Sequence, residues 1–315
     1  MDLSLSGCDD EPRKEPPVSA QPAPPPVARV TAVSLRAFKE SGRAIVMLTA
    51  YDHPSARLVE DSGVDAILIG DSMGMTVLGH PSTLPVTVDD IVRATAAVTR
   101  GTSRVLVVAD MPFMSYQASY EDGMHNAGRL VAEGGAHAVK LEGATTGVLA
   151  LTRGLSEAGI PVMGHVGLTP QSVNALGGYR TQATDAATAA KLLEDCVALE
   201  QAGAFAIVLE CIPAELASRA TALLHIPTIG IGAGAGCDGQ VQVFHDVLGL
   251  GDFLPKHAKR YADLGAEVKR AVSAYAADVR AHQFPGEAQT THASRDASAI
   301  TEQVSDSTPH PGSFS

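Results

Sequence analysis

Eight short apolar runs, separated by polar stretches, constrain the fold of this 315-residue chain more than any other feature. They are rich in Val and Ile and almost continuously hydrophobic, which is typical of parallel strands covered on both faces. Helical patterns lie between most of them, most clearly at 88–100 and 186–203. This alternation predicts a closed α/β barrel, the (β/α)₈ TIM barrel, rather than an open sheet. The runs span residues 44–50, 66–70, 104–110, 136–142, 160–166, 204–210, 226–232 and 240–246.

Both ends of the chain lack this pattern. Residues 1–30 are rich in Pro and charge, and residues 286–315 are rich in small polar residues, so we expect two disordered tails. The barrel domain is then residues 31–285, about 255 residues, a typical length for such a barrel. The stretch from Lys259 to His282 is expected to form its closing helix.

Charge and cysteine content exclude several classes of function. A formal net charge of -12 argues against a nucleic-acid partner, whose phosphates need a basic surface. No apolar run approaches the length of a membrane span, so no membrane association is expected. The four cysteines show no CxxC spacing, which argues against a zinc site or a disulfide framework and fits a reducing cytoplasm.

Polar residues stand at the carboxyl ends of the second to sixth runs. In a barrel these ends converge at one mouth, where the active sites of this fold lie. Several acids and a lysine gathered there would be a costly cluster of buried charge unless a cation or a substrate neutralised it. The residues are Asp71 and Ser72, Asp110, Lys140 and Glu142, His165, and Glu210.

Carboxylates without cysteine favour a hard cation, Mg²⁺ in particular. Such a cation can chelate the carboxylate and keto oxygens of a 2-oxo acid and stabilise an enolate as a Lewis acid. A nearby glutamate can remove the proton next to the carbonyl. The pattern therefore predicts enolate chemistry on a small oxo acid.

All of these residues except Glu210, whose charge at the end of a buried strand favours function, also have a purely structural interpretation. Asp71 and Ser72 could cap the next element, and Asp110 could be a turn residue. Lys140 and Glu142 alternate on one strand and could form a structural ion pair, while His165 could be a core histidine.

Two neighbouring features are also ambiguous. Cys211 follows Glu210, but no base partner for a nucleophilic thiol is evident in the sequence. The glycine-rich segment 229–239 could bind phosphate or could allow tight backbone packing at the mouth.

The order of seven motifs resembles the ketopantoate hydroxymethyltransferase family, from about Thr31 to Gly286. So many motifs in one order are far more specific than any one of them. They are TAYD (49–52), GDSMGMTVLGH and TLPVT (within 70–87), ADMPFMSY (109–116), VKLEG (139–143), GHVGLTPQSVNALGGY (164–179), LECIP (209–213) and IGIGAGAGCDGQV (229–241).

The resemblance implies a barrel of the phosphoenolpyruvate/pyruvate type that assembles as a homodecamer. It implies a Mg²⁺-dependent transfer of a hydroxymethyl group from 5,10-methylenetetrahydrofolate to 3-methyl-2-oxobutanoate, which gives 2-dehydropantoate for pantothenate biosynthesis. It also implies a role for each strand-end residue: Asp71, Asp110 and Glu142 at the metal; Asp71, Ser72, Asp110, Lys140 and His165 around the oxo acid; and Glu210 as the general base.

Two residues depart from the family pattern. Gln242 stands where an aliphatic residue is usual and His257 where Phe is frequent, both expected away from the acids. Two rival functions remain. One is a C–C lyase or mutase of the same barrel superfamily, which commonly carries a reactive cysteine in a mouth loop. The other is a catalytically inactive barrel that serves as a scaffold.

Overall fold

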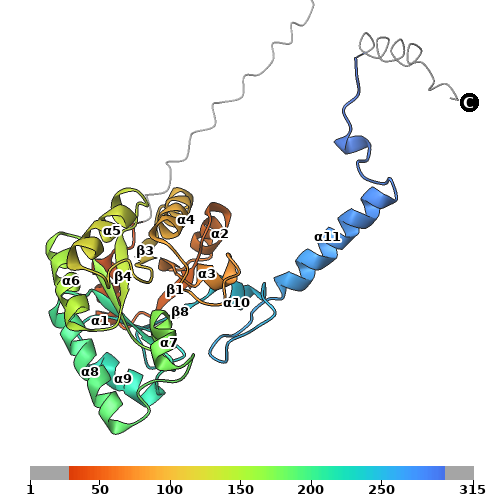
Figure 1. The fold of residues 1–315 in the computed structure, drawn as a ribbon. Helices are drawn as coiled ribbons and strands as arrows, with labels where there is room; N and C mark the ends of the chain where they lie inside the picture. Colours follow the sequence, from red (N-terminus) through yellow and green to blue (C-terminus); the bar gives the residue numbers. More distant parts are fainter. Residues whose placement is uncertain (1–27, 295–315) are drawn as a thin grey trace, which may run out of the picture.

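The computed structural model describes residues 28–294 and contains a closed barrel of eight parallel strands, as predicted (Figure 1). Each strand pairs with its neighbours in chain order, and β8 pairs with β1 to close the ring. The strands are β1 (Ile45–Thr49), β2 (Ala66–Ile69), β3 (Leu106–Asp110), β4 (Ala138–Glu142), β5 (Val162–Gly167), β6 (Ala206–Glu210), β7 (Thr228–Ile231) and β8 (Gly239–Gln242).

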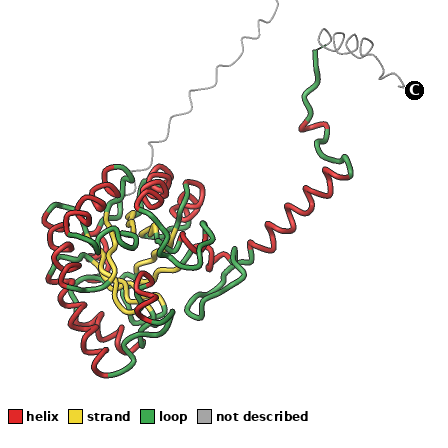
Figure 2. Tube along the Cα trace, in the orientation of Figure 1, coloured by secondary structure: helices red, strands yellow, loops and turns green. Residues whose placement is uncertain are grey.

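Helices surround the strands (Figure 2). The two helices expected from pattern alone are both confirmed, as α4 and α8. Helix α4 begins at a capping box in which the Thr87 hydroxyl accepts a hydrogen bond from the Asp90 backbone, and the Asp90 carboxylate bonds back to Thr87. The helices are α1 (Ala32–Glu40), α2 (His53–Asp61), α3 (Met73–Thr76), α4 (Val88–Gly101), α5 (Tyr120–Ala132), α6 (Thr146–Glu157), α7 (Val173–Leu176), α8 (Ala186–Gln201), α9 (Ala214–Leu223), α10 (Phe244–Leu248) and α11 (Leu264–Arg280), with 3₁₀ turns η1 (Pro170–Ser172) and η2 (Glu287–Gln289).

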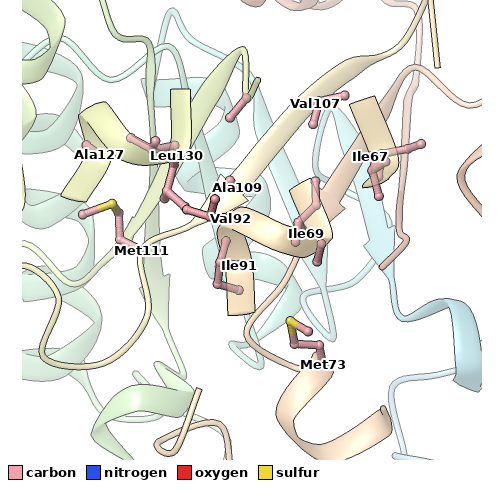
Figure 3. Close-up of a cluster of buried hydrophobic side chains, with 14 of the residues drawn as sticks. Ile67, Ile69, Met73, Ile91, Val92, Val107, Ala109, Met111, Ala127 and Leu130 are labelled. Atoms are coloured by element: carbon pink, nitrogen blue, oxygen red, sulfur yellow. The ribbon is translucent and has the colours of Figure 1, made fainter. Parts of the chain in front are cut away.

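The strands are continuously hydrophobic because both of their faces are buried. On β2, Ile67 and Ile69 point outward and pack with residues of α4 and α5, in the cluster that Figure 3 shows. The intervening residues Ala66 and Leu68 belong to a separate cluster that fills the barrel interior. Successive strand residues alternate between the two clusters, as the period of a strand requires.

The same alternation places the predicted polar residues inside the barrel. Leu106 and Val108 belong to the interior cluster, so Asp110, two residues further along β3, points to the same side. Ala138 on β4 and Val208 on β6 are interior residues too, and the side chains that follow at spacings of two are those of Lys140, Glu142 and Glu210. The polar side chains therefore form the upper layer of the barrel interior.

The end of the barrel differs from the prediction in two ways. The eighth run continues as a strand only to Gln242, and Phe244–Leu248 form helix α10 instead. Helix α11 lies within the expected stretch 259–282, but it does not close the barrel: it runs away from it (Figure 1), and none of its residues is buried. Its amphipathic pattern thus predicts a helix correctly but does not indicate which surface covers it.

The two predicted tails lie mostly outside the described part of the chain, since residues 1–27 and 295–315 are not described. At the near end of the first tail, the Val30 backbone N–H donates to the Arg104 carbonyl at 2.7 Å, which joins residue 30 to the barrel. Among residues 28–294, no helix is both long enough and apolar enough to cross a membrane.

Gly167 ends β5 at the mouth of the barrel and tolerates no side chain. Its φ is +96°, and a Cβ there would lie 2.3 Å from the Glu210 carbonyl oxygen. We expect Gly167→Ala to lower the free energy of unfolding by at least about 2 kcal/mol, because left-handed strain and a backbone clash add together. Urea unfolding followed by circular dichroism measures this. An equally large loss in Gly147→Ala, whose Cβ would meet little, would contradict the explanation.

Candidate active site

A cavity of about 930 Å³ opens at the carboxyl ends of the strands. This is the range of volumes typical of small-molecule sites, and the mouth of the barrel is where they occur in this fold. The cavity is lined by all seven residues that the sequence singled out: Asp71, Ser72, Asp110, Lys140, Glu142, His165 and Glu210.

Asp71 and Asp110 lie side by side at the floor of the cavity. The Asp71 backbone N–H donates to Asp110 Oδ2 at 2.9 Å, and the other oxygen, Asp110 Oδ1, lies 2.9 Å from Lys140 Nζ. The paired register of β3 and β4, which sets Asp110 opposite Lys140, brings this ion pair together. All three side chains are buried. The structural interpretation expected an ion pair between Lys140 and Glu142. Lys140 does form an ion pair, but its nearer partner is Asp110, while Glu142 Oε1 lies 3.9 Å from Lys140 Nζ.

The electrostatics of this cluster are unbalanced. Burial, and then the charges of Asp110 and Glu142, raise the pKa of Asp71 well above its usual value. Burial opposes the charge of Lys140, but the surrounding carboxylates outweigh it and raise the Lys140 pKa. The lysine therefore stays charged, but the four carboxylates of the cluster (Asp71, Asp110, Glu142 and Glu210) outnumber its two cationic groups, Lys140 and His165. Such a site favours a further cation.

His165 connects this cluster to Glu210. Its Nδ1 lies 3.2 Å from Lys140 Nζ and 3.5 Å from Glu142 Oε1, and its Nε2 lies 3.2 Å from Glu210 Oε2. Burial and the Lys140 charge lower the His165 pKa, but the bonds to Glu142 and Glu210 outweigh them and raise it to about 9. His165 is therefore buried, as a core histidine would be, but it contacts two of the carboxylates that the sequence singled out.

The Glu210 side chain is 15 % exposed and faces the cavity from the end of β6. The chain turns sharply after it, because Cys211 has a φ of +49°, which is unusual for a residue with a side chain. Two backbone hydrogen bonds hold this turn: Cys211 N–H donates to the Ile231 carbonyl, and Gln182 N–H donates to the Cys211 carbonyl, both at 2.9 Å. A fixed turn of this kind keeps Glu210 at the cavity wall.

Ser72 does not cap the helix that follows it. It occupies the N-cap position of α3, but its side chain accepts no capping hydrogen bond. Its hydroxyl lies 2.9 Å from the Tyr51 hydroxyl, and both Ser72 and the adjacent Asp71 line the cavity. The capping interpretation of Ser72 is therefore wrong.

The donor set suits a hard cation that keeps part of its own shell. Within residues 28–294, no group of three or more His, Cys, Asp and Glu side chains is arranged to hold a metal ion. Mg²⁺ does not require one, because it is commonly bound by one or two carboxylates with waters and substrate oxygens in the other positions. Asp71 and Asp110 provide such a pair, and a divalent ion would offset the excess of carboxylates in this cluster.

Sequence reasoning missed three neutral side chains in this site: Tyr51, Tyr116 and Gln171. The Gln171 amide donates to Asp71 Oδ2 at 2.9 Å, and the Tyr116 hydroxyl accepts a bond from the Glu142 backbone at 3.0 Å. All three lie within the motifs TAYD, ADMPFMSY and GHVGLTPQSVNALGGY. The motifs marked their segments, but an argument restricted to charged groups at strand ends could not select them.

The two residues that depart from the family pattern lie nearer the acids than expected. Gln242 and His257 both line the same cavity, and the Gln242 amide donates to the His257 carbonyl at 3.4 Å. His257 Nδ1 also lies 3.6 Å from Cys211 Sγ, so the thiol does have a neighbouring imidazole. Burial and the Glu210 charge nevertheless raise the Cys211 pKa to about 11, which keeps the sulfur protonated.

Comparison with known proteins identifies relatives over most of the chain. The family model described as ketopantoate hydroxymethyltransferase matches residues 29–287. A 3-methyl-2-oxobutanoate hydroxymethyltransferase of Carboxydothermus hydrogenoformans is 58% identical over 260 residues, which cover 82% of this chain and 94% of that protein. One from Gluconacetobacter diazotrophicus is 54% identical over 264 residues, covering 84% and 95% respectively.

Solved structures of lower identity share the fold. A phosphonopyruvate hydrolase matches with a TM-score of 0.56 at 14% identity, over 89% of this chain and 97% of that one. A 2,3-dimethylmalate lyase, titled a member of the PEP mutase/isocitrate lyase superfamily, matches with a TM-score of 0.53 at 18% identity, over 87% and 98%. These likenesses support the predicted type of barrel.

Proposed function

The chain belongs to the ketopantoate hydroxymethyltransferase family, and on this premise we propose that it transfers a hydroxymethyl group to 3-methyl-2-oxobutanoate, forming 2-dehydropantoate for pantothenate biosynthesis. The names of relatives that are more than 50% identical to this chain support the substrate and the reaction. The cavity supports the chemistry, as its residues provide a base and a site for a cation.

One observation carries the mechanism: Glu210 and the Asp71–Asp110 pair face the same cavity, joined through Lys140 and His165. A base beside a cation site is the arrangement that proton removal next to a carbonyl needs. A binding site alone would not require a carboxylate opposite the cation.

Each residue of the site has a separate role in this proposal. Asp71 and Asp110 would hold Mg²⁺, with Glu142 in the same shell, and the ion would supply Lewis-acid polarisation of the substrate carbonyl. The Lys140 ammonium, together with the Ser72 hydroxyl, binds the oxygens of the oxo acid. Glu210 takes the proton from C3. The electron pair of that C–H bond forms a double bond between C3 and the carbonyl carbon, and the carbonyl π pair moves to the oxygen, which gives an enolate.

His165 supports Glu210 during this step. Its Nε2 lies 3.2 Å from Glu210 Oε2, so the protonated ring donates to the carboxylate and orients it toward the substrate. His165 also borders the oxo acid, because it lines the same cavity.

The one-carbon donor in our proposal is 5,10-methylenetetrahydrofolate. A cavity of about 930 Å³ is larger than a small branched oxo acid requires, and the remaining space reaches the loop around Lys256 and His257. The enolate carbon bonds to the folate methylene carbon as one of its two C–N bonds breaks, and the freed nitrogen takes up the proton that Glu210 removed from C3. Water then displaces the second nitrogen: its oxygen becomes the hydroxyl on that carbon, one of its protons goes to the nitrogen, and tetrahydrofolate is released.

The rival lyases of this barrel superfamily commonly carry a reactive cysteine in a mouth loop. Cys211 is the cysteine that lines the cavity, and its raised pKa of about 11 disfavours the thiolate. An inactive scaffold would have no reason to retain four buried charged groups around one cavity, at the cost that such burial carries.

Hydrogen–deuterium exchange tests the proposed base chemistry. Proton NMR of 3-methyl-2-oxobutanoate in D₂O, with the purified protein, Mg²⁺ and tetrahydrofolate, should show loss of the C3 proton signal. Addition of EDTA should stop the loss. An unchanged signal with all components present would leave the inactive scaffold as the better interpretation.

We also propose that the protein self-associates, as the family resemblance implies for a decamer. Helix α11 carries an apolar stripe on one face, and it leaves the barrel in Figure 1, so the barrel does not cover the stripe. Val46 on β1 is 49% exposed, beside a hollow of about 550 Å³ against β1 and β8. A second copy can cover both surfaces. The stripe is Leu264, Val268, Val272, Tyr275 and Val279, with Val272 58% exposed.

Val272→Asp is therefore expected to dissociate the assembly, because a carboxylate would be buried in an apolar contact. Light scattering coupled to size-exclusion chromatography would show a mass decrease relative to the wild type. Ala277→Asp, on the opposite face of α11, is the matched control and should leave the mass unchanged. A monomeric wild-type protein, or equal behaviour of both variants, would contradict the proposed interface.

We assign the protein to the cytoplasm. The three cysteines of the described chain, Cys196, Cys211 and Cys237, are free thiols, which fits a reducing compartment.

A further inference from the structure

Gln171, on the loop that follows β5, makes four hydrogen bonds with its side-chain amide. Its Nε2 donates to Asp71 Oδ2 and to the Met111 carbonyl, both at 2.9 Å. Its Oε1 accepts from the Tyr116 hydroxyl at 3.0 Å and from Gln117 Nε2 at 2.9 Å. A backbone carbonyl can only accept, so the atom that faces Met111 must be the nitrogen, and this fixes the orientation of the amide.

The backbone of Gln171 holds a second carboxylate. Its N–H donates to Glu142 Oε2 at 3.0 Å. Tyr116 reinforces this arrangement, because its hydroxyl donates to the Gln171 amide and accepts from the Glu142 backbone N–H at 3.0 Å. One buried, uncharged residue thus contacts Asp71 through its side chain and Glu142 through its backbone.

These bonds decide which carboxylate oxygens remain for a ligand. The Gln171 amide takes Oδ2 of Asp71, which leaves Oδ1. Its backbone takes Oε2 of Glu142, which leaves Oε1 beside Lys140 and His165. Without these bonds, the buried carboxylates of Asp71 and Glu142 could rotate. Their like charges would then favour rotamers that turn the two groups away from each other.

We propose that Gln171 is a positioning residue for the cation site: it presets the ligand-facing oxygens of Asp71 and Glu142 and so raises the affinity for the divalent ion. The inference rests on the proposed function, since it assumes that Asp71 binds a cation. Residues that orient metal ligands in this way typically contribute about 10- to 100-fold to metal affinity.

The test is direct Mn²⁺ binding, measured from the electron paramagnetic resonance signal of the free ion without substrate. Gln171→Met keeps the length of the side chain and removes its amide. We expect its Mn²⁺ Kd to rise about 10- to 100-fold. Gln240→Met is the matched control, because Gln240 bonds the Gly234 carbonyl outside this cavity, and its Mn²⁺ affinity should equal that of the wild type.

A second readout separates positioning from a role in folding or in the chemistry itself. If Gln171 acts through the cation site, saturating Mn²⁺ should restore the C3 exchange rate of Gln171→Met to near the wild-type rate. Should Gln171→Met fail to fold, Tyr116→Phe, which removes the hydroxyl that orients the amide, must show a weaker Mn²⁺ affinity in its place. Wild-type Mn²⁺ affinity in the folded variant would overturn the inference and leave the proposed function intact. Absence of Mn²⁺ binding to the wild type would overturn both.

Discussion

Glu210→Gln is expected to slow deuterium exchange at C3 of 3-methyl-2-oxobutanoate by about 10²- to 10⁴-fold, the usual contribution of a positioned general base. The amide has the shape of the carboxylate and can still accept a hydrogen bond from His165 Nε2, so the cavity should keep its structure. It cannot take the C3 proton. Proton NMR in D₂O, at saturating Mg²⁺ and tetrahydrofolate, measures the rate directly.

Binding must be preserved for this result to identify the base. We expect the thermal stability and Mn²⁺ affinity of Glu210→Gln to stay near the wild-type values, since Glu210 lies outside the proposed metal ligands. Glu215→Gln is the matched control: Glu215 is exposed on the first turn of α9, and its loss should leave exchange unchanged. Wild-type exchange in Glu210→Gln would exclude Glu210 as the base.

Asp71→Asn is expected to lower exchange by about 10²-fold or more while leaving the metal-free protein at least as stable as the wild type. Loss of a metal ligand removes Lewis-acid stabilisation worth several kcal/mol in the transition state. The expected stability of the metal-free variant has a separate cause. Burial and the charges of Asp110 and Glu142 disfavour an ionised Asp71, and a neutral amide removes both the desolvation cost and the charge repulsion. The carbonyl oxygen of the new amide could still accept the Gln171 bond.

Thermal unfolding with and without Mg²⁺ distinguishes these effects. Mg²⁺ should raise the melting temperature of the wild type, because a ligand of the folded state stabilises it, and it should have little effect on the variant. Asp61→Asn, which removes an exposed carboxylate at the end of α2, should behave like the wild type. A metal-free Asp71→Asn protein that melts well below the wild type would mean that Asp71 stabilises the fold as a charge and that the site needs no cation.

The barrel and its charged residues were predictable because both follow from local patterns. Val- and Ile-rich runs can be buried on both faces only in a covered parallel sheet, and closure brings the strand ends together. The period of two then decides the face: Lys140 and Glu142 share one, and the structure sets both in the cavity. The ion pair between Asp110 and Lys140 was not predictable, because it depends on the register of β3 against β4, which the sequence does not reveal.

What escaped prediction depends on contacts between distant segments. Gln171 lies 100 residues from Asp71 along the chain, and a neutral glutamine in a loop has no local signature of the carboxylate it binds. Helix α11 shows the opposite problem. Its apolar stripe specifies a helix that needs a cover, but the pattern is the same whether the cover is its own barrel or a second molecule.

Transfer of a labelled carbon tests the proposed function most directly. The purified protein would be incubated with Mg²⁺, 3-methyl-2-oxobutanoate and 5,10-methylenetetrahydrofolate that carries ¹³C in the methylene group, and the products analysed by mass spectrometry and carbon NMR. We predict ¹³C in the new hydroxymethyl group of 2-dehydropantoate, absent with EDTA and restored by excess Mg²⁺. A protein that exchanges the C3 proton but never incorporates ¹³C would contradict hydroxymethyl transfer and favour a different enolate reaction on the same barrel.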